Sequence, residues 1–160
     1  PMARELKKIG VDYFTVKPFS QHPQSGNILQ VDYQEMLDVE KEIKELETED
    51  YKIYFRAHSM NKLVCERGYT QCLALPFMVY IDAKGNLWPC IVFMGKEELS
   101  YGNLYAETFE EIWEGKRRRD LIRYFADMDL EKNCRELCRL DEMNRYLNEL
   151  KHPGGHVNFI

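Results

Sequence analysis

The sequence predicts an α+β fold in two parts, with β/α units up to about residue 60 and a small β-hairpin plus helices after it. Two segments rich in β-branched and aromatic residues alternate with helical patterns in the first part, which favours parallel strand pairing. In the second part the turn sequence "DAKG" separates two short apolar segments, as in a hairpin. The apolar fraction of 44% is typical of a chain that folds.

The first part opens with a helix and a strand. Residues 2–9 have a helical pattern, and Gly10 is expected to end the helix because glycine readily adopts the left-handed conformation. The segment "VDYFTVKPF", residues 11–19, is rich in β-branched and aromatic residues and predicts a mostly buried strand.

A second helix and a second strand follow. Apolar residues at spacings of three and four predict a helix over 32–47, with Asp32 as its N-cap and Glu35 completing a capping box. The segment "YKIYFRAH", residues 51–58, predicts the second strand. These elements are too few for a closed barrel or a complete doubly wound sheet, and we interpret them as the last units of one.

The second part contains the hairpin and a turn. Residues 77–93 predict two short strands around Asp82 and Gly85, where glycine takes the left-handed position of the turn. The sequence "YGNL", residues 101–104, predicts a further turn.

Helices are expected to follow the hairpin. Thr108 and Glu111 form a capping-box pattern that opens a helix, and the apolar phase slips near Gly115, which predicts a break. A last helix is expected over roughly 134–150, followed by an extended tail rich in proline and glycine, residues 152–160.

Charge and hydropathy exclude several classes of partner. The net charge is −5 and the pI is near 5.5, so we expect no binding to nucleic acid. The basic run "KRRRD", residues 116–120, is interpreted as a solvated face. No apolar run reaches the roughly 20 residues that span a membrane. No secretory signal is visible, so we expect a cytoplasmic protein without a disulfide framework.

Four of the five cysteines can be brought together by the predicted elements. Cys134 and Cys138 are four apart and would share one face of a helical turn. Cys90 is placed on the returning strand of the hairpin, and Cys72 shortly precedes the first strand. From spacing alone, three readings stay open: a [4Fe–4S] cluster, a four-thiolate zinc site, or core cysteines without metal.

The order of motifs from about residue 65 to 150 favours one of these three interpretations. It consists of Gly68 shortly before Cys72, then "YIDAKGNLWPC" with Cys90, "YGNL", "TFEEIWEGKRRRDL" and the terminal cysteine pair. This region resembles the SPASM/Twitch domain of radical S-adenosylmethionine enzymes. The short Twitch form binds one auxiliary [4Fe–4S] cluster, and five cysteines supply only one complete ligand set.

The resemblance implies the ligands of that cluster. They are Cys72, Cys90, Cys134 and Cys138, with Cys65 left over as a substitute for Cys72 or as a free thiol. The sequence departs from the family at the last pair, which is often separated by two residues and here by three. The neighbouring residues Arg135 and Arg139 are expected to offset the negative charge of a thiolate-ligated cluster.

The resemblance also assigns the two parts of the chain. Residues 1–60 resemble the end of the partial parallel β/α barrel of these enzymes, and residues 61–160 the auxiliary cluster domain. The family's CxxxCxxC motif, which holds the radical-generating [4Fe–4S] cluster and S-adenosylmethionine, is absent. We therefore expect the C-terminal part of a longer oxidoreductase that is not competent by itself. The full enzyme would take electrons from a donor such as a flavodoxin or ferredoxin.

Substrate contacts are expected at the carboxyl ends of the predicted strands. The candidates there are Lys17, Gln21, His22, Arg56 and His58. The resemblance implies a small polar substrate, sugar-like or aminocyclitol-like, or a peptide. A competing hypothesis is a zinc-stabilised four-cysteine binding module without a redox role. We also expect self-association as a homodimer, which would cover the open edge of the strand pair.

Overall fold

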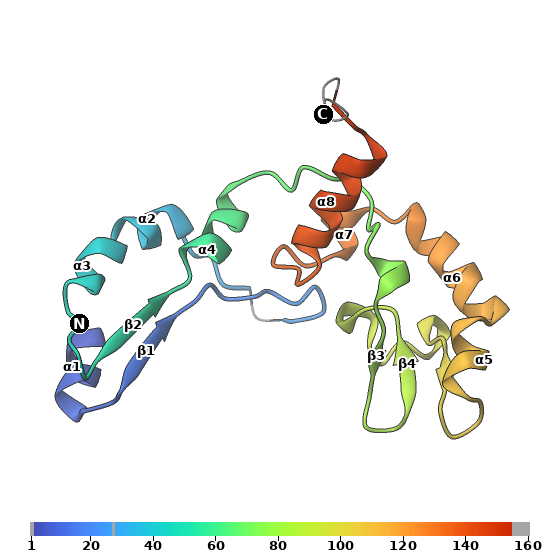
Figure 1. The fold of residues 1–160 in the computed structure, drawn as a ribbon, viewed down its shortest axis with the longest axis horizontal. Helices are drawn as coiled ribbons and strands as arrows, with labels where there is room; N and C mark the ends of the chain where they lie inside the picture. The colour runs from blue at the N-terminus through green and yellow to red at the C-terminus, as the bar shows by residue number, and fades with distance from the viewer. Residues whose placement is uncertain (1, 27, 155–160) are drawn as a thin grey trace, which may run out of the picture. The chain divides into compact units, whose positions relative to one another are not determined.

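The structure is a computed structural model that describes residues 2–26 and 28–154 (Figure 1). Contacts within the chain define two compact units. Unit 1 comprises residues 1–21 and 25–66, and unit 2 comprises residues 22–24 and 67–160. The predicted assignment of residues 1–60 to a barrel and 61–160 to a cluster domain stays a prediction. The end of the predicted tail, residues 155–160, lies outside the described residues.

Helices and short strands alternate in unit 1, whereas in unit 2 the strands precede the α-helices. The α-helices are α1 (Met2–Ile9), α2 (Tyr33–Asp38), α3 (Glu40–Lys44), α4 (Ala57–Val64), α5 (Phe109–Trp113), α6 (Lys116–Ala126), α7 (Leu130–Asn133) and α8 (Asp141–Lys151). The strands are β1 (Tyr13–Val16), β2 (Lys52–Phe55), β3 (Tyr80–Ile81), β4 (Asn86–Trp88) and β5 (Gly102–Asn103). Three 3₁₀ turns are η1 (Leu75–Phe77), η2 (Ile91–Phe93) and η3 (Glu97–Leu99).

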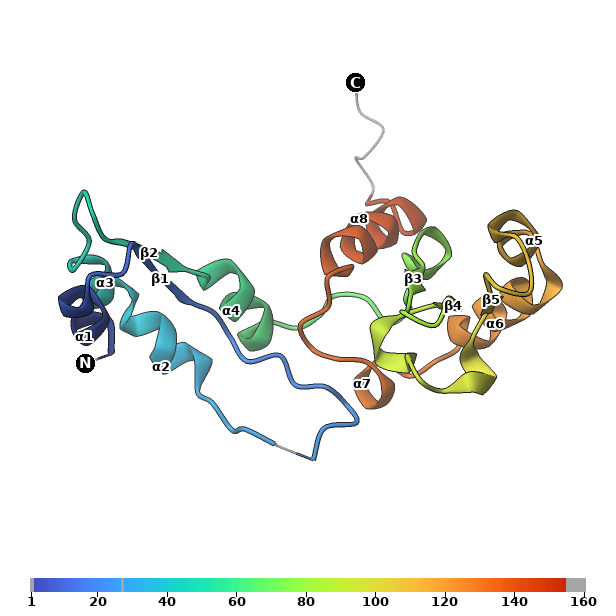
Figure 2. The same cartoon turned by 90° about the horizontal axis from the view of Figure 1, so that it is seen from below.

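Unit 1 is built on a parallel strand pair. β1 and β2 run side by side, in register from Tyr13 opposite Lys52 to Val16 opposite Phe55 (Figure 2). This confirms the predicted parallel pairing. The described residues close no barrel, so membership in a partial barrel stays a prediction.

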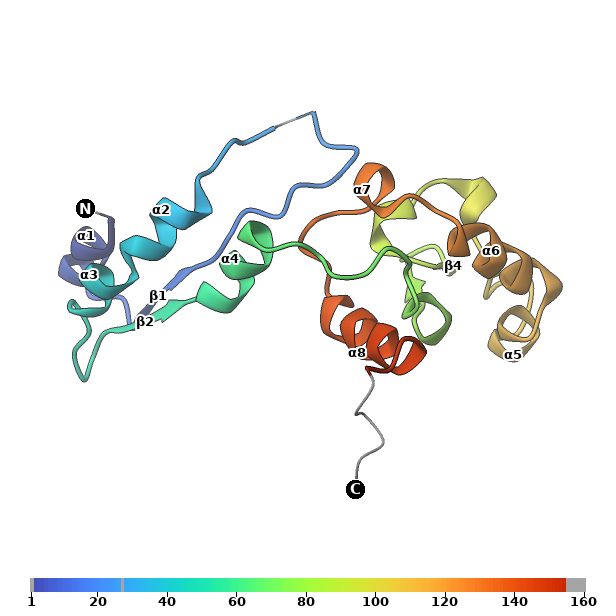
Figure 3. The ribbon, with the colours of Figure 1, turned by 90° about the horizontal axis from the view of Figure 1, so that it is seen from above.

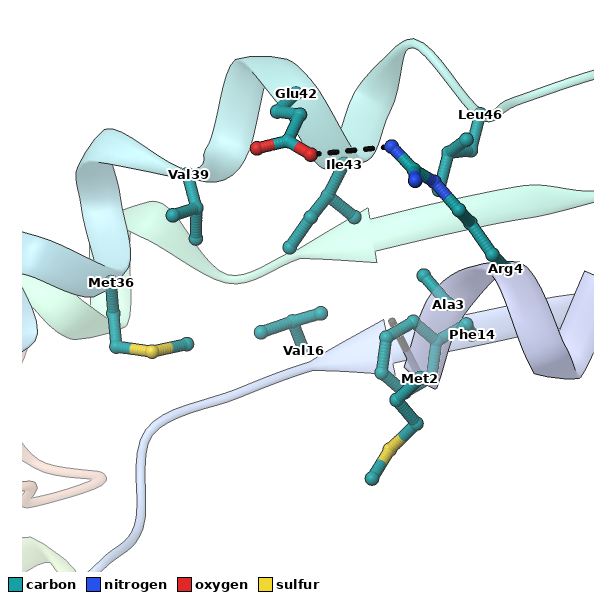
Figure 4. Close-up of a pocket in the computed structure, with 10 residues that line it drawn as sticks. All are labelled: Met2, Ala3, Arg4, Phe14, Val16, Met36, Val39, Glu42, Ile43 and Leu46. Carbon is teal, nitrogen blue, oxygen red and sulfur yellow. Dashed lines mark hydrogen bonds and ion pairs between the residues drawn. The ribbon is translucent and has the colours of Figure 1, made fainter.

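The helices of unit 1 cover the sheet face that carries Phe14 and Ile53. Ile53 is fully buried, and the Tyr51 hydroxyl donates to the Ala3 carbonyl at 2.9 Å, which ties α1 to the start of β2. A pocket of about 270 Å³ remains between α1, β1 and the α2–α3 segment (Figure 4). Its lining is mostly apolar, and its two charged residues, Arg4 and Glu42, pair with each other at 3.4 Å.

Local signals in unit 1 are confirmed where a cap or glycine sets the backbone. Gly10 ends α1 with a φ of 85°, and the Asp32 carboxylate caps α2 by accepting from the backbone N–H groups of Gln34 and Glu35. The single helix predicted over 32–47 is wrong, because the chain breaks at Val39 into α2 and α3.

Two further expectations for unit 1 are corrected. The predicted strand over 11–19 shortens to β1 and is not mostly buried, since Tyr13 is 62% exposed. The helices cover only one face of the strand pair, so side chains on the other face remain open to solvent. Helix α4 was not predicted, and it begins directly after Arg56.

Unit 2 contains the predicted hairpin as part of a three-stranded antiparallel sheet in the order β3-β4-β5. The Asp82 carboxylate organises the turn. It accepts from the backbone N–H groups of Lys84 and Asn86, the Asn86 side-chain amide and the Trp88 indole, at 2.8–3.0 Å. Gly85 takes the left-handed position with a φ of 77°, as predicted. The sequence "YGNL" contains strand β5, with a turn only after it.

The next helices follow the predicted caps. Thr108 and Glu111 form the capping box of α5, and Gly115 separates α5 from α6. The interpretation of residues 116–120 as a solvated face is wrong at Arg118, which is only 8% exposed. Its guanidinium donates to the carbonyls of Trp113 and Pro76 at 3.0 and 2.6 Å and stacks on the Trp113 ring. Tertiary contacts therefore bury one arginine of this charged run.

The last predicted helix, over 134–150, is also corrected. Asp129 caps the short helix α7, and α8 begins only at Asp141. Residues 134–140 between them form an irregular loop. Among the described residues, no helix is both long and apolar enough to cross a membrane.

Candidate metal centre

Cys72 and Cys90 lie beside the hairpin of unit 2, and we call this pair the hairpin side. Cys72 stands in the irregular segment before η1, and Cys90 follows the end of β4 by two residues rather than lying on the strand. Both cysteines are half-buried. They pack against one buried core cluster, which consists of Leu75, Val92, Phe93 and Phe125.

Cys134 and Cys138 lie in the loop between α7 and α8, and we call this pair the loop side. The expectation that they share a helical face is wrong. Cys134 is the C-cap of α7, where its backbone turns extended (φ −115°, ψ 154°). Because the chain leaves the helical conformation here, the four-residue spacing no longer sets the geometry of the pair.

Electrostatic interactions nevertheless connect all four cysteines. A hydrogen bond from Cys134 lowers the pKa of the Cys138 thiol, and the same contact raises the pKa of Cys134. Burial raises the pKa of Cys72 and Cys90, and the nearby negative charge of Cys138 raises both further. The structure therefore brings the hairpin side and the loop side into one neighbourhood within unit 2.

Several N–H groups donate to the sulfur atoms. The Leu140 backbone N–H donates to Cys138 Sγ at 3.3 Å, and the Asn144 side-chain amide donates to Cys72 Sγ at 3.7 Å. Backbone hydrogen bonds also favour the thiolates of Cys72 and Cys90. Such donors stabilise negative charge on sulfur and are typical of the outer shell of thiolate-ligated metal sites.

Two arginines add positive charge at the loop side. Arg135 and Arg67 both contribute to the lowered pKa of Cys138, and the expected effect of Arg135 on a bound cluster stays a prediction. The Arg67 guanidinium also donates to the carbonyls of Leu130 and Arg135, at 3.3 and 3.0 Å. Arg139 lowers the pKa of Tyr80, which Cys90 and Cys138 raise, and its expected effect on a bound cluster also stays a prediction.

The donor set fits an iron–sulfur cluster. It offers four soft thiols, hydrogen-bond donors to sulfur and two guanidinium groups beside an apolar core. In residues 2–26 and 28–154, no three His, Cys, Asp or Glu side chains are arranged around a single metal ion. A cubane cluster binds one cysteine at each iron, so its four ligands need not meet at one point.

Cys65 differs from the other cysteines. It is exposed, it caps the C-terminus of α4, and it belongs to unit 1. Its role as a substitute ligand for Cys72 stays a prediction.

The predicted substrate residues are distributed over both units. Lys17 and Arg56 are exposed and directly follow Val16 and Phe55, the last register partners of β1 and β2. His58 is exposed in the first turn of α4.

The two remaining substrate candidates belong to different compact units. Gln21 belongs to unit 1, whereas His22 belongs to unit 2, where its Nδ1 accepts from the Gln24 backbone N–H at 3.2 Å. Of the five predicted residues, only Lys17 and Arg56 directly follow the last paired residues of the two neighbouring strands.

Sequence reasoning missed Arg67 and Asn144. Arg67 precedes Gly68 of the recognised motif, so its place next to the motif was the available signal. Asn144 is 1% exposed although asparagine is usually a surface residue, and no sequence pattern distinguishes it from Asn148, the other amide of α8.

Comparison with known proteins supports the reading of unit 2. Residues 72–139 match the family model of SPASM, described as an iron–sulfur cluster-binding domain. The match includes Cys72, Cys90, Cys134 and Cys138 and excludes Cys65. Neither the curated proteins nor the solved structures compared with the chain gave a significant match. Residues 72–139 are therefore similar to the SPASM iron–sulfur cluster-binding domain, in agreement with the resemblance found in the sequence.

Proposed function

We propose that this chain binds one auxiliary [4Fe–4S] cluster through Cys72, Cys90, Cys134 and Cys138. One observation supports this most strongly: the four cysteines within the SPASM match are those that interact electrostatically in unit 2. The match to an iron–sulfur domain favours this proposal over a structural zinc site.

The proposed role of the site is electron transfer. A cluster with four cysteine ligands exchanges single electrons and leaves no iron open to a substrate. The apolar core beside Cys72 and Cys90 excludes water from one side of the site. Arg67 and Arg135 favour negative charge on Cys138, and the Leu140 N–H supports the same sulfur.

We further propose that the chain belongs to a radical S-adenosylmethionine oxidoreductase. The radical-generating cluster and S-adenosylmethionine would be bound by a CxxxCxxC motif, which this sequence does not contain. In such an enzyme a flavodoxin or ferredoxin would supply electrons. The proposed substrate is small and polar, sugar-like or aminocyclitol-like, or a peptide.

The strand pair of unit 1 would contribute to the substrate site. Lys17 and Arg56 follow neighbouring strands at their carboxyl ends, where parallel sheets commonly bind ligands. Two cations that follow neighbouring strands suit an anionic or hydroxyl-rich group. We keep Gln21, His22 and His58 as weaker candidates, and homodimer formation as a prediction that a mass measurement in solution tests.

Metal analysis after anaerobic reconstitution tests the cluster proposal. The chain is incubated with ferrous iron and sulfide, desalted, and analysed for iron, sulfide and zinc. We expect about four irons and four sulfides per chain. Binding of one zinc in competition, with no retained sulfide, would instead support the zinc-stabilised module and contradict the proposal.

A further inference from the structure

Asn144 joins α8 to the segment that carries Cys72. Its side chain is 1% exposed, and its Oδ1 accepts from the Ala74 backbone N–H at 2.8 Å. Its Nδ2 donates to Cys72 Sγ at 3.7 Å, within the range of N–H···S hydrogen bonds. Figure 3 shows α8 running beside this segment.

Successive turns of α8 hold the same segment in different ways. Asp141 accepts from the Tyr69 hydroxyl at 3.0 Å, and Asn148 donates to the Gly68 carbonyl at 3.3 Å. Both contacts hold the chain without touching a cysteine. Of the side-chain amides in the described residues, the hydrogen bonds place only that of Asn144 against a cysteine sulfur. The Asn144 Oδ1 atom holds the backbone at Ala74, and its Nδ2 atom faces the Cys72 thiol.

We propose that Asn144 tunes the reduction potential of the bound cluster by donating a hydrogen bond to the sulfur of Cys72. This inference rests on the proposed function, because it requires the cluster. Asn144 lies beyond residues 72–139, so the contact comes from outside the segment that matches the SPASM family. It acts through Cys72 and is therefore a positioning residue.

The direction of the effect follows from charge. Reduction adds one electron to the cluster and raises the negative charge on its sulfur ligands, so an N–H donor binds the reduced form more strongly than the oxidised form. Removal of the donor therefore lowers the reduction potential. Burial strengthens the effect because little water can replace the lost donor.

A redox titration of the reconstituted 160-residue chain tests the inference. Asn144→Leu removes the amide and keeps the branched shape of the side chain, and Asn148→Leu is the matched control on the same helix. We expect Asn144→Leu to have a more negative potential than the wild type and Asn148→Leu to keep the wild-type potential. Equal potentials for all three proteins would overturn the inference.

A second measurement needs no variant and applies even if Asn144→Leu fails to fold. The wild-type chain is labelled with ¹⁵N-asparagine, reconstituted and reduced, and studied by pulsed electron paramagnetic resonance. We expect a hyperfine coupling from an asparagine nitrogen, and its absence would overturn the inference. A wild-type chain that binds no cluster would instead refute the proposed function, so the two failures are distinguishable.

Discussion

The hairpin side and the loop side of the candidate site are stabilised in different ways. Cys72 and Cys90 pack against a buried core next to a three-stranded sheet. Cys134 and Cys138 lie in an irregular loop that is supported by Arg67 and the Leu140 N–H. We therefore expect folding alone to fix the hairpin side, whereas the loop side should depend more on what it binds. Metal binding is often coupled to folding in this way.

Replacement of one cysteine on each side should have the largest effect on cluster binding. It also tests whether the hairpin side and the loop side differ in stability. We expect Cys90→Ser and Cys138→Ser each to lose most of the iron after reconstitution, because each removes one of four ligands. Without iron, only Cys90→Ser should lower the melting temperature clearly, since Cys90 packs against the core. Iron content and thermal unfolding measure the two effects.

Cys65→Ser is the matched control for these variants. Cys65 is exposed in unit 1 and lies outside the SPASM match, so we expect its replacement to leave the iron content unchanged. Loss of iron in Cys65→Ser, with full iron in Cys72→Ser, would show that Cys65 is the fourth ligand.

Arg118→Leu should destabilise the core next to the hairpin side. The variant leaves the carbonyls of Pro76 and Trp113 without their donor and removes the stacking on Trp113. We expect a loss of about 2–4 kcal/mol in the free energy of unfolding, measured by denaturant titration. The exposed Arg123→Leu is the control and should cost less than about 1 kcal/mol. Equal losses of unfolding free energy in the two variants would mean that the buried contacts of Arg118 contribute nothing to stability.

Arg67→Leu should destabilise the loop side, with a smaller loss of stability than Arg118→Leu. Its guanidinium donates to the carbonyls of Leu130 and Arg135, so its loss should lower stability by about 1–2 kcal/mol. Hydrogen exchange should accelerate in residues 134–140 and stay unchanged in the hairpin. Faster exchange in both regions would contradict the independence of the two sides.

Asp82→Asn should change how the hairpin responds to acid. Hydrogen bonds from Asn86 and Trp88 hold the pKa of Asp82 at about 2, below the value of about 3.9 in an unfolded chain. Its contribution to stability is therefore present above about pH 4 and is lost as the pH falls toward 2. We expect the wild type to be the more stable protein at pH 7 and the difference to shrink on acidification. Melting temperatures measured from pH 7 to pH 3 check this, with Asp50→Asn as an exposed control.

Local signals in the sequence were sufficient for much of the fold. The caps at Asp32 and Thr108 and the turn glycine Gly85 each act within a few residues, and each is confirmed. The parallel pairing of β1 and β2 also followed from the order of elements. The order of motifs predicted the similarity of residues 72–139 to an iron–sulfur cluster-binding domain.

Features that depend on distant contacts could not be predicted. Arg118 is buried because the Pro76 carbonyl, 42 residues away, accepts from it, and no charge pattern indicates this partner. Asn144 acquires its role from Ala74 and Cys72, which are about 70 residues away. The spacing of Cys134 and Cys138 suggested a helix, but the extended backbone at Cys134 ends α7 there.

Native mass spectrometry of the anaerobically reconstituted chain tests the central claim most directly. It weighs the intact protein with its bound group and thereby distinguishes a cluster from a single ion. We predict a mass increase that corresponds to four irons and four sulfides in the wild type and in Cys65→Ser, and no such increase in Cys138→Ser. A wild-type chain that carries no added mass, or the mass of one zinc ion, would contradict the account.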